Sequence, residues 1–481
     1  MAPLVVGFDL DMTLIDSRDG IRAVYDVLSA ETGVVIDSAL AVGRLGPPLD
    51  VELAHWVPAE RIPALADRYR ELYPEHAITV SGVLPGAVEA LAAVRRHGAG
   101  VVVVTGKHTA NARLHLDHSG LVVDEVEGWA PDQQTMYGEG KAAALRRHGV
   151  GVYVGDHVAD LAAAHAAGAV AVGVPTGPYD RAALLAAGAD VVLDDLTGFP
   201  AWFDEHVLAV RLTALTARLA ELGGLVVAFS GGADSAFLLA TAVDVLGADR
   251  VVAATAVSPS LPANELAGAT AFAADLGVRH LTPRTGELAR PGYRANAGDR
   301  CFHCKAELLD TVAPLAAELG LPAVATGTNA DDVVAGFRPG IRAAAERGAV
   351  TPLLDAGLTK EQIRTASRRR GLSTWDKPAA ACLSSRIAYG VPVTSRALAR
   401  VERAEAALRT ALEDAGLAVT DLRVRDLGGD AARVEVDAPL VTVLTDRPDL
   451  LAAVEEFRTV TIEPFRSGSM NELLAEPGRY R

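Results

Sequence analysis

The sequence predicts an α/β protein with two doubly wound parallel-sheet domains and a small α+β subdomain at its C-terminal end. A chain of 481 residues is too long for one hydrophobic core, because single domains usually contain about 100 to 200 residues. Short valine-rich runs alternate with Ala- and Leu-rich helical stretches in both halves, which is typical of parallel β-α-β sheets. Near residue 395 this alternation ends, which predicts the third, smaller part.

The first half contains four runs that predict buried strands, at 4–8, 100–104, 151–154 and 169–174. We place this domain at residues 1–203. Residues 194–206 carry Gly, Pro and polar side chains and precede a helical stretch that ends in glycine, so we expect the boundary near 200–208.

The second half repeats the pattern, with strands predicted at 225–229, 250–257 and 322–326 in a domain at 208–394. The remaining residues, 395–481, predict a long helix to about 415. Strands at 422–426 and 432–436, a helix from 448 and a strand at 459–462 follow. This order predicts the small α+β subdomain.

The composition excludes several classes of function. Lys and Arg total 45 and Asp and Glu total 61, so the net charge is -16, which argues against a large surface for binding nucleic acid. No apolar run reaches the roughly 18 to 20 residues that span a bilayer, and the first residues do not resemble a secretory signal. We therefore expect a cytoplasmic protein without membrane partners. We further expect that its substrates are small molecules and that it forms a homo-oligomer.

Acidic side chains mark the strand ends of the first half. Asp9 and Asp11 follow the first strand, at the edge of a parallel sheet where ligands bind. Several carboxylates need a cation to coexist, and hard oxygen ligands beside a lysine and a hydroxyl suit Mg²⁺ with a phosphoryl group. A carboxylate can then attack phosphorus directly. The other positions at or near strand ends are Thr105, Lys141, Asp156 and Asp160.

This ordered set resembles the haloacid dehalogenase superfamily over about residues 1–200, and residues 16–80 resemble the helical cap of its phosphoglycolate-phosphatase-like branch. The resemblance implies that Asp9 forms an aspartyl-phosphate and that Asp11 is the general acid and base. It also implies that Thr105 and Lys141 hold the phosphoryl oxygens. A domain that binds phosphate without turnover is the alternative. The implied Mg²⁺ site comprises Asp9, Asp11, Asp156 and Asp160.

A glycine turn opens the second half between a strand and a helix. The two glycines let backbone N–H groups approach an anion, and the helix N-terminus favours negative charge, so the turn predicts a phosphate site. The lysine of a Walker A loop is missing. The turn resembles the SGGxDS loop of the PP-loop ATP pyrophosphatases, which adenylate a substrate oxygen; a plain strand-to-helix turn is the alternative. Its residues are Ser230, Gly231, Gly232, Ala233, Asp234 and Ser235.

Further motifs follow this loop, and together they are similar to the LarE family over about residues 208–481. LarE proteins are ATP-dependent sulfur transferases that make the thiocarboxylates of the nickel-pincer nucleotide cofactor. The sequence departs from the family at two positions. Leu427 stands before Gly428 where a histidine is expected, and Glu463 stands where an aspartate is usual. The motifs are RCFHCK with Cys301 and Cys304, the segment 327–332, FRPG with Arg338, CLSSR with Cys382 and Arg386, ARVEV with Glu435, and FRSGSMNE from Arg466.

The resemblance implies that ATP activates a carboxylate of pyridinium-3,5-biscarboxylic acid mononucleotide, and that sulfur comes from the position of Cys382. It implies that ATP and pyrophosphate contact the 230–235 loop, Gly327 and Arg386, and that Glu435 is a metal ligand. The two resemblances together predict a phosphatase fused to a sulfur transferase. A PP-loop tRNA 2-thiolation enzyme with a [4Fe-4S] cluster is the alternative, which the negative net charge disfavours.

The three cysteines, Cys301, Cys304 and Cys382, leave the sulfur source open. Single-cysteine LarE members sacrifice the sulfur at the position of Cys382, whereas three-cysteine members are thought to hold a [4Fe-4S] cluster. Three thiolates suit a cluster with an open iron, because structural zinc usually takes four ligands. Zinc with His303 as its fourth ligand and a thioredoxin-like dithiol are weaker alternatives.

Overall fold

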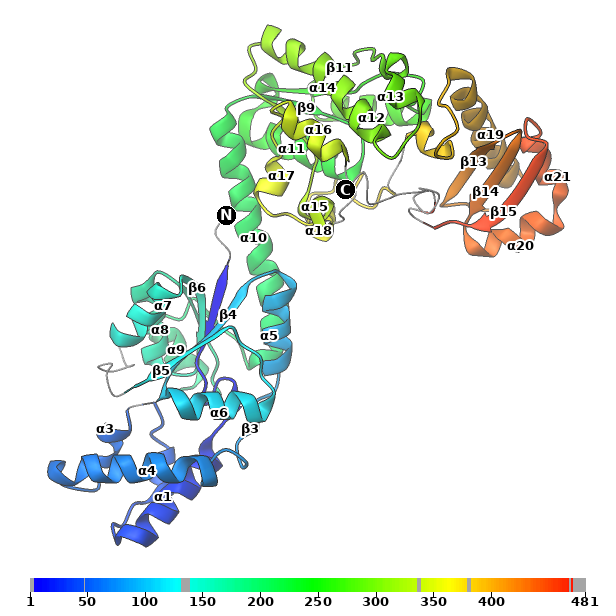
Figure 1. Cartoon of the computed structure of the whole chain (residues 1–481). Coiled ribbons are helices and arrows are strands. Elements are labelled where there is room, and N and C mark those ends of the chain that lie inside the picture. The colour runs from blue at the N-terminus through cyan, green and yellow to red at the C-terminus, as the bar shows by residue number, and fades with distance from the viewer. Residues whose placement is uncertain are drawn as a thin grey trace. The chain divides into compact units, whose positions relative to one another are not determined.

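The computed structural model describes residues 4–46, 48–130, 139–334, 339–378, 382–466 and 469. By their contacts they form two compact units, Met1–Val207 and Leu208–Arg481. Parallel sheets flanked by helices dominate both units (Figure 1), which confirms the predicted α/β class. Among the described residues, no helix is long and apolar enough to cross a membrane.

A six-stranded parallel sheet forms the centre of the first unit. Val101 and Val103 pack into the core on one face, while Val102 and Val104 pack into the core on the other. Because both faces of the sheet are buried, the sequences of the central strands consist mainly of consecutive apolar residues. The order is β5 (Glu125–Trp129), β4 (Gly100–His108), β1 (Val5–Phe8), β6 (Val150–Gly155), β7 (Val170–Gly173) and β8 (Val191–Val192).

Two helical layers cover this sheet. The core that contains Val101 also contains residues of α5 (Ala87–Arg96) and α6 (Thr109–Ser119). The core that contains Val102 contains residues of α7 (Glu139–Arg147), α8 (Val158–Ala167) and α9 (Arg181–Ala186). The edge strands β5 and β8 were not predicted, because neither contains a long valine run.

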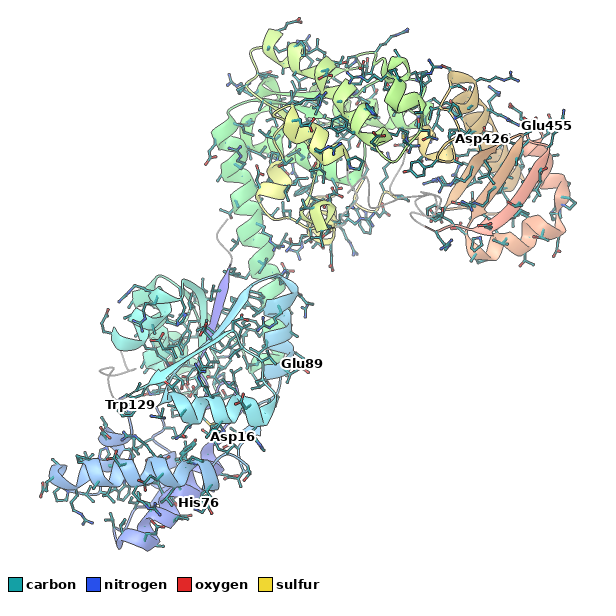
Figure 2. All side chains as sticks on the ribbon, viewed as in Figure 1. Asp16, His76, Glu89, Trp129, Asp426 and Glu455 are labelled. Atoms are coloured by element: carbon teal, nitrogen blue, oxygen red, sulfur yellow. The ribbon has the colours of Figure 1, made fainter. Side chains whose placement is uncertain are left out.

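A helical cap is inserted after β1 and has a hydrophobic core of its own. Its chain leaves and returns through a two-stranded antiparallel ribbon, β2 (Ile15–Asp16) and β3 (Gly82–Val83). Figure 2 marks Asp16 in this ribbon and His76 at the end of the last cap helix. The cap helices are α1 (Arg18–Thr32), α2 (Ser38–Val42), α3 (Leu49–Leu53) and α4 (Ile62–His76).

The predicted break at 194–206 is instead partly helical, because α10 runs from Phe199 to Leu222. Phe199 and Phe203 belong to the core of the first unit, while Leu215 and Leu219 belong to a core of the second. Pro200 lies in the first turn of the helix, where its missing N–H breaks no hydrogen bond. Gly198 and Pro200 therefore mark the start of a helix and not a linker.

A four-stranded parallel sheet forms the centre of the second unit. Its order is β11 (Arg279–Leu281), β10 (Val251–Ala254), β9 (Leu225–Ala228) and β12 (Val324–Thr326). Helices α11 (Ala233–Leu246), α12 (Ala263–Asp275) and α18 (Lys360–Arg369) pack into one core, and α14 (Arg300–Glu318) packs into another.

The last part of the chain builds a three-stranded mixed sheet. β13 (Leu422–Gly428) pairs antiparallel with β14 (Ala431–Val436), which pairs parallel with β15 (Thr459–Pro464). Residues of α19 (Ser395–Asp414), α20 (Ala438–Asp446) and α21 (Pro448–Leu451) share its core. Leu383 and Ile387 enter the same core and so fix the segment that follows Cys382.

Candidate active sites

The carboxyl end of β1 carries a group of buried acids. Lys141, on α7, lies with its Nζ 3.0 Å from Asp9 Oδ1 and 2.5 Å from Asp160 Oδ1. Asp156 follows β6, and its Oδ1 accepts a hydrogen bond of 3.1 Å from the hydroxyl of Thr13. Ligand oxygens of Asp9, Asp156 and Asp160 lie within 4.8 Å of one another. The fold therefore gathers residues that are up to 151 positions apart in sequence (160 minus 9).

The charge of this group fits a divalent cation. Burial raises the pKa of Asp9 to about 7 against the opposing effect of Lys141, and the neighbouring acids Asp160 and Asp11 add to the rise. Burial, together with Asp160 and Asp9, raises the pKa of Asp156 well above its usual value. One lysine cannot neutralise three buried carboxylates, and a cation among them would. Mg²⁺ prefers such oxygen ligands.

Asp11 is paired with Lys107, which in turn contacts Tyr73; the sequence reasoning missed both of these residues. Lys107 Nζ lies 3.0 Å from Asp11 Oδ1 and also donates to the hydroxyl of Tyr73, on cap helix α4. Although burial opposes it, Lys107 together with Ser17 keeps the pKa of Asp11 below its usual value. The only sequence signal was that Lys107 follows Thr105 at one strand end. That Asp11 also binds Mg²⁺ stays a prediction.

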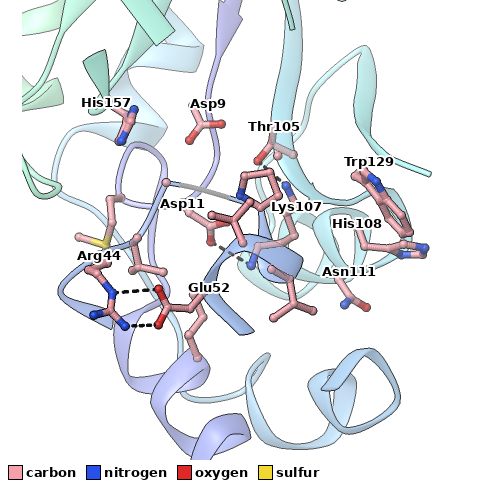
Figure 3. A pocket seen from close by; sticks show the side chains of 18 of the residues that line it. Asp9, Asp11, Arg44, Glu52, Thr105, Lys107, His108, Asn111, Trp129 and His157 are labelled. Carbon is pink, nitrogen blue, oxygen red and sulfur yellow. Dashed lines mark hydrogen bonds and ion pairs between the residues drawn. The ribbon is translucent and has the colours of Figure 1, made fainter. Parts of the chain in front are cut away.

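Both sets of residues line one cavity of about 330 Å³ between the sheet edge and the cap. Figure 3 shows Asp9, Asp11 and Thr105 on the side of the sheet and Arg44 with Glu52 on the side of the cap. Thr105 is buried, and its Oγ1 accepts a hydrogen bond from the backbone N–H of Lys107 at 3.3 Å. The cavity has the size of a small-molecule site.

In the second unit the glycine turn joins β9 to α11. Gly231 has φ +71°, which favours glycine, and Gly232 is the N-cap of α11. The hydroxyls of Ser230 and Ser235 lie 3.2 Å apart. A side chain at Gly327, after β12, would place its Cβ 2.9 Å from the backbone nitrogen of Ser235. Glycines thus allow two strand ends to meet at the start of a 14-residue helix, where an anion binds favourably.

Two carboxylates flank this turn. Asp234 Oδ2 accepts a hydrogen bond of 3.0 Å from the amide of Asn329, whose backbone N–H donates to Asp332 at 3.2 Å. Lys360 Nζ lies 3.1 Å from Asp332 Oδ1. Burial, followed by the charge of Asp332, raises the pKa of Asp234. A pair of acids beside a phosphate loop suits the Mg²⁺ that accompanies ATP.

The three thiols lie near one another without forming a close group. Cys301 and Cys304 belong to the first turns of α14, and Cys382 precedes the short helix η5 (Leu383–Arg386). Burial, then the charges of Cys382, Glu287 and Cys301, raise the pKa of Cys304 well above its usual value. Within the described ranges the three sulfurs do not come within 4.8 Å of one another, as one shared ion would require. Zinc, the iron-sulfur cluster and sacrificial transfer from Cys382 all stay predictions.

Two other predicted site residues are engaged by side chains of the α+β part. Arg386 contacts both oxygens of Glu405 on α19, at 2.9 and 3.2 Å. Glu435 is buried and accepts hydrogen bonds from Arg425 at 3.0 and 2.8 Å. Arg433 lies 3.1 Å from the other oxygen of Glu435. The role of Glu435 as a metal ligand stays a prediction, since cations of the protein already surround it. The motif residues Arg338, 467–468 and 470–472 lie outside the described residues.

Comparison with known proteins gives a family for each half. The model of the haloacid dehalogenase-like hydrolases matches residues 6–165, and a second model of HAD-hydrolase-like proteins matches residues 141–199. The probable phosphatase IndB of Dickeya dadantii is 31% identical over 208 residues, which cover 40% of this chain and 90% of that protein.

The second half matches the pyridinium-3,5-bisthiocarboxylic acid mononucleotide synthase of Lactiplantibacillus plantarum. The identity is 33% over 56% of this chain and 96% of the synthase. This chain belongs to the LarE family, fused to a haloacid dehalogenase-like hydrolase. The uncharacterized protein slr1717 of Synechocystis is 40% identical over 56% of this LarE fusion and 100% of its own length. Both predicted resemblances and the prediction of an enzyme are thus confirmed, and tRNA thiolation is not favoured.

Proposed function

We propose that this chain is a bifunctional enzyme, a Mg²⁺-dependent phosphomonoester hydrolase joined to an ATP-dependent sulfur transferase. The contact of Lys141 with both Asp9 and Asp160 beside Asp156 supports the first activity. The similarity to the synthase over nearly its whole length, with a glycine loop at the start of α11, supports the second.

In the first unit Asp9 acts as the nucleophile. Its carboxylate oxygen attacks phosphorus, the bond from phosphorus to the leaving oxygen breaks, and the protonated form of Asp11 gives that oxygen a proton. Water then attacks the aspartyl-phosphate, Asp11 takes the proton, and phosphate leaves. Lys141 and Thr105 hold phosphoryl oxygens. Mg²⁺, when bound by Asp9 and Asp156 with Asp160 in support, offsets the negative charge of the carboxylates and the phosphoryl group.

In the second unit a substrate carboxylate attacks the α-phosphorus of ATP and pyrophosphate leaves. The backbone of the 230–235 loop, close to Gly327, holds the phosphates. A sulfur nucleophile from the position of Cys382 then attacks the acyl carbon, and AMP leaves with the former carboxylate oxygen. If the nucleophile is the Cys382 thiolate, the thioester loses the Cα proton of residue 382 and its Cβ–Sγ bond breaks, which releases the thiocarboxylate and leaves dehydroalanine. If the nucleophile is a sulfide held by a cluster, its bond to iron breaks instead. The proposed substrate is pyridinium-3,5-biscarboxylic acid mononucleotide, and the product is its thiocarboxylate.

One preparation of the full chain tests both activities. With ATP and the pyridinium dicarboxylate, we expect AMP, pyrophosphate and a product heavier by one sulfur-for-oxygen exchange, measured by mass spectrometry. With p-nitrophenyl phosphate, we expect phosphate release that needs Mg²⁺ and stops with a chelator. Absence of AMP release would contradict the transferase, absence of hydrolysis would contradict the phosphatase, and hydrolysis that continues without Mg²⁺ would contradict the role of the metal.

The source of the sulfur needs a separate measurement. Iron and acid-labile sulfide in anaerobically purified protein, beside Cys301→Ser, distinguish the two routes. About four irons per chain, lost in the variant, support a cluster. Absence of iron, with dehydroalanine at position 382 after one turnover, supports sacrificial transfer.

A further inference from the structure

The cap side of the first cavity carries cations that are already paired. Arg44 donates to both oxygens of Glu52 at 3.0 and 2.6 Å (Figure 3). Arg70 lies 3.0 Å from Asp67 and 3.5 Å from Asp50. Arg44 therefore belongs to a neutral ion pair, and Arg70 to a group with one net negative charge. An anion on the substrate would have to displace a carboxylate of the protein.

The described lysines of the sheet side are also paired, and burial lowers the pKa of the two histidines that line the cavity, His108 and His157, which favours their neutral form. Lys107 is paired with Asp11, and Lys141 with Asp9 and Asp160. These four, Arg44, Arg70, Lys107 and Lys141, are the arginines and lysines among the described residues that line the cavity. Residues 131–138, which precede α7 in the chain, contain neither arginine nor lysine.

The cavity does offer aromatic rings and neutral polar atoms. The rings of Tyr25 and Tyr69 lie 5.0 Å apart on the cap, and Trp129 at the end of β5 lies below Arg70 at 4.2 Å. Neither tyrosine hydroxyl makes a hydrogen bond with another described residue, and the amide of Asn111, 6% exposed, makes none either. These three groups can donate to and accept from a ligand without adding charge.

We infer that the phosphatase substrate is a phosphomonoester whose leaving group is aromatic and uncharged. This inference rests on the proposed phosphatase function and narrows it. A ring in the leaving group would contact the tyrosine and tryptophan rings. Its neutral polar atoms would bind Asn111 and the tyrosine hydroxyls. A carboxylate on the leaving group would lose its bound water on entering the cavity and would find no unpaired cation there. The uncompensated desolvation would weaken binding.

A matched pair of substrates tests this on the full chain. Phenyl phosphate and 4-carboxyphenyl phosphate share a ring and differ by one carboxylate, and phosphoglycolate serves as a small carboxylate-bearing ester. We expect kcat/KM for phenyl phosphate to exceed that for each of the other two by about tenfold or more. Equal values, or a preference for either carboxylate, would overturn the inference. No hydrolysis of any of the three or of p-nitrophenyl phosphate would contradict the phosphatase itself.

Glu52→Gln sharpens the test because it releases Arg44 from its carboxylate while keeping the shape of the side chain. We expect the ratio of kcat/KM for phenyl phosphate to kcat/KM for 4-carboxyphenyl phosphate to fall about threefold or more in this variant. The fall should come chiefly from a higher kcat/KM for 4-carboxyphenyl phosphate. Glu60→Gln, at an exposed cap position, should leave this ratio unchanged. An unchanged ratio in a Glu52→Gln protein with wild-type circular dichroism would refute the role of the paired arginine. The wild-type comparison stands even if this variant does not fold.

Discussion

The two candidate sites of this chain are built from different parts of the polypeptide. In the first unit, charged side chains contact one another directly, as Lys141 contacts Asp9 and Asp160. In the second, the 230–235 loop presents hydroxyls and backbone at a helix N-terminus, and Gly327 packs against Ser235 without a side chain between them. Removing a single side chain should therefore damage the charged group of the first site, while adding a single methyl group should already damage the phosphate loop of the second.

The largest effect should come from the nucleophile of the first site. Asp9→Asn removes the attacking carboxylate but keeps its shape, so p-nitrophenyl phosphate turnover should fall by about 10⁴-fold or more. AMP release by the second unit should stay within about twofold, because the residues of its site belong to the other unit. A parallel loss of both activities would show that the two sites are coupled.

The comparable variant of the second site is Cys382→Ala. Thiocarboxylate formation should fall below detection whether the sulfur comes from Cys382 itself or from a cluster. The first route loses its sulfur atom, and the second loses a thiolate that binds the cluster. Phosphate ester hydrolysis should be unchanged. Thiocarboxylate production at the wild-type rate, measured by mass spectrometry, would assign sulfur delivery to another group.

A smaller effect should follow from crowding the loop of the second site. Gly327→Ala would place a Cβ 2.9 Å from the nitrogen and 3.1 Å from the Cα of Ser235, so the backbone must shift. We expect kcat/KM for ATP to fall by about 10²-fold, since small displacements of bound groups slow reaction. Gly268→Ala, at a helical position with open space, is the control and should be neutral. Equal values for the two variants would argue against close packing.

The smallest effect should come from Lys107→Met. Asp11 would lose its ion pair, and Tyr73 on the cap would lose its hydrogen bond from Lys107 on the sheet. We therefore expect kcat for phosphate ester hydrolysis to fall by about tenfold. Arg113→Met, at an exposed position of α6, should have no effect. A loss as large as that of Asp9→Asn would instead make Lys107 a direct participant.

Much of the fold and part of each site could be predicted from the sequence. The valine runs predicted the central strands, because residues buried on both faces of a sheet must all be apolar. The order of Asp9, Thr105, Lys141 and Asp156 predicted a shared edge, because parallel strands end on the same side. The short strands β5 and β8 and the start of α10 were not predicted, because their residues pack through tertiary contacts that leave no periodic pattern.

The sequence by itself determined which residues stand at strand ends and which loop begins α11, since these depend on local order along the chain. Only the tertiary structure decided which charges pair. Lys107 meets Asp11 and Tyr73, and Arg44 meets Glu52, because the cap folds back onto the sheet and within itself. Two charges pair only if they are close in space. Packing decides which opposite charge lies near a buried charge, and that pairing offsets part of the cost of burial. The residues proposed to carry the chemistry could therefore be predicted from the chain, while the charge pairing on which the proposed selectivity depends comes from packing.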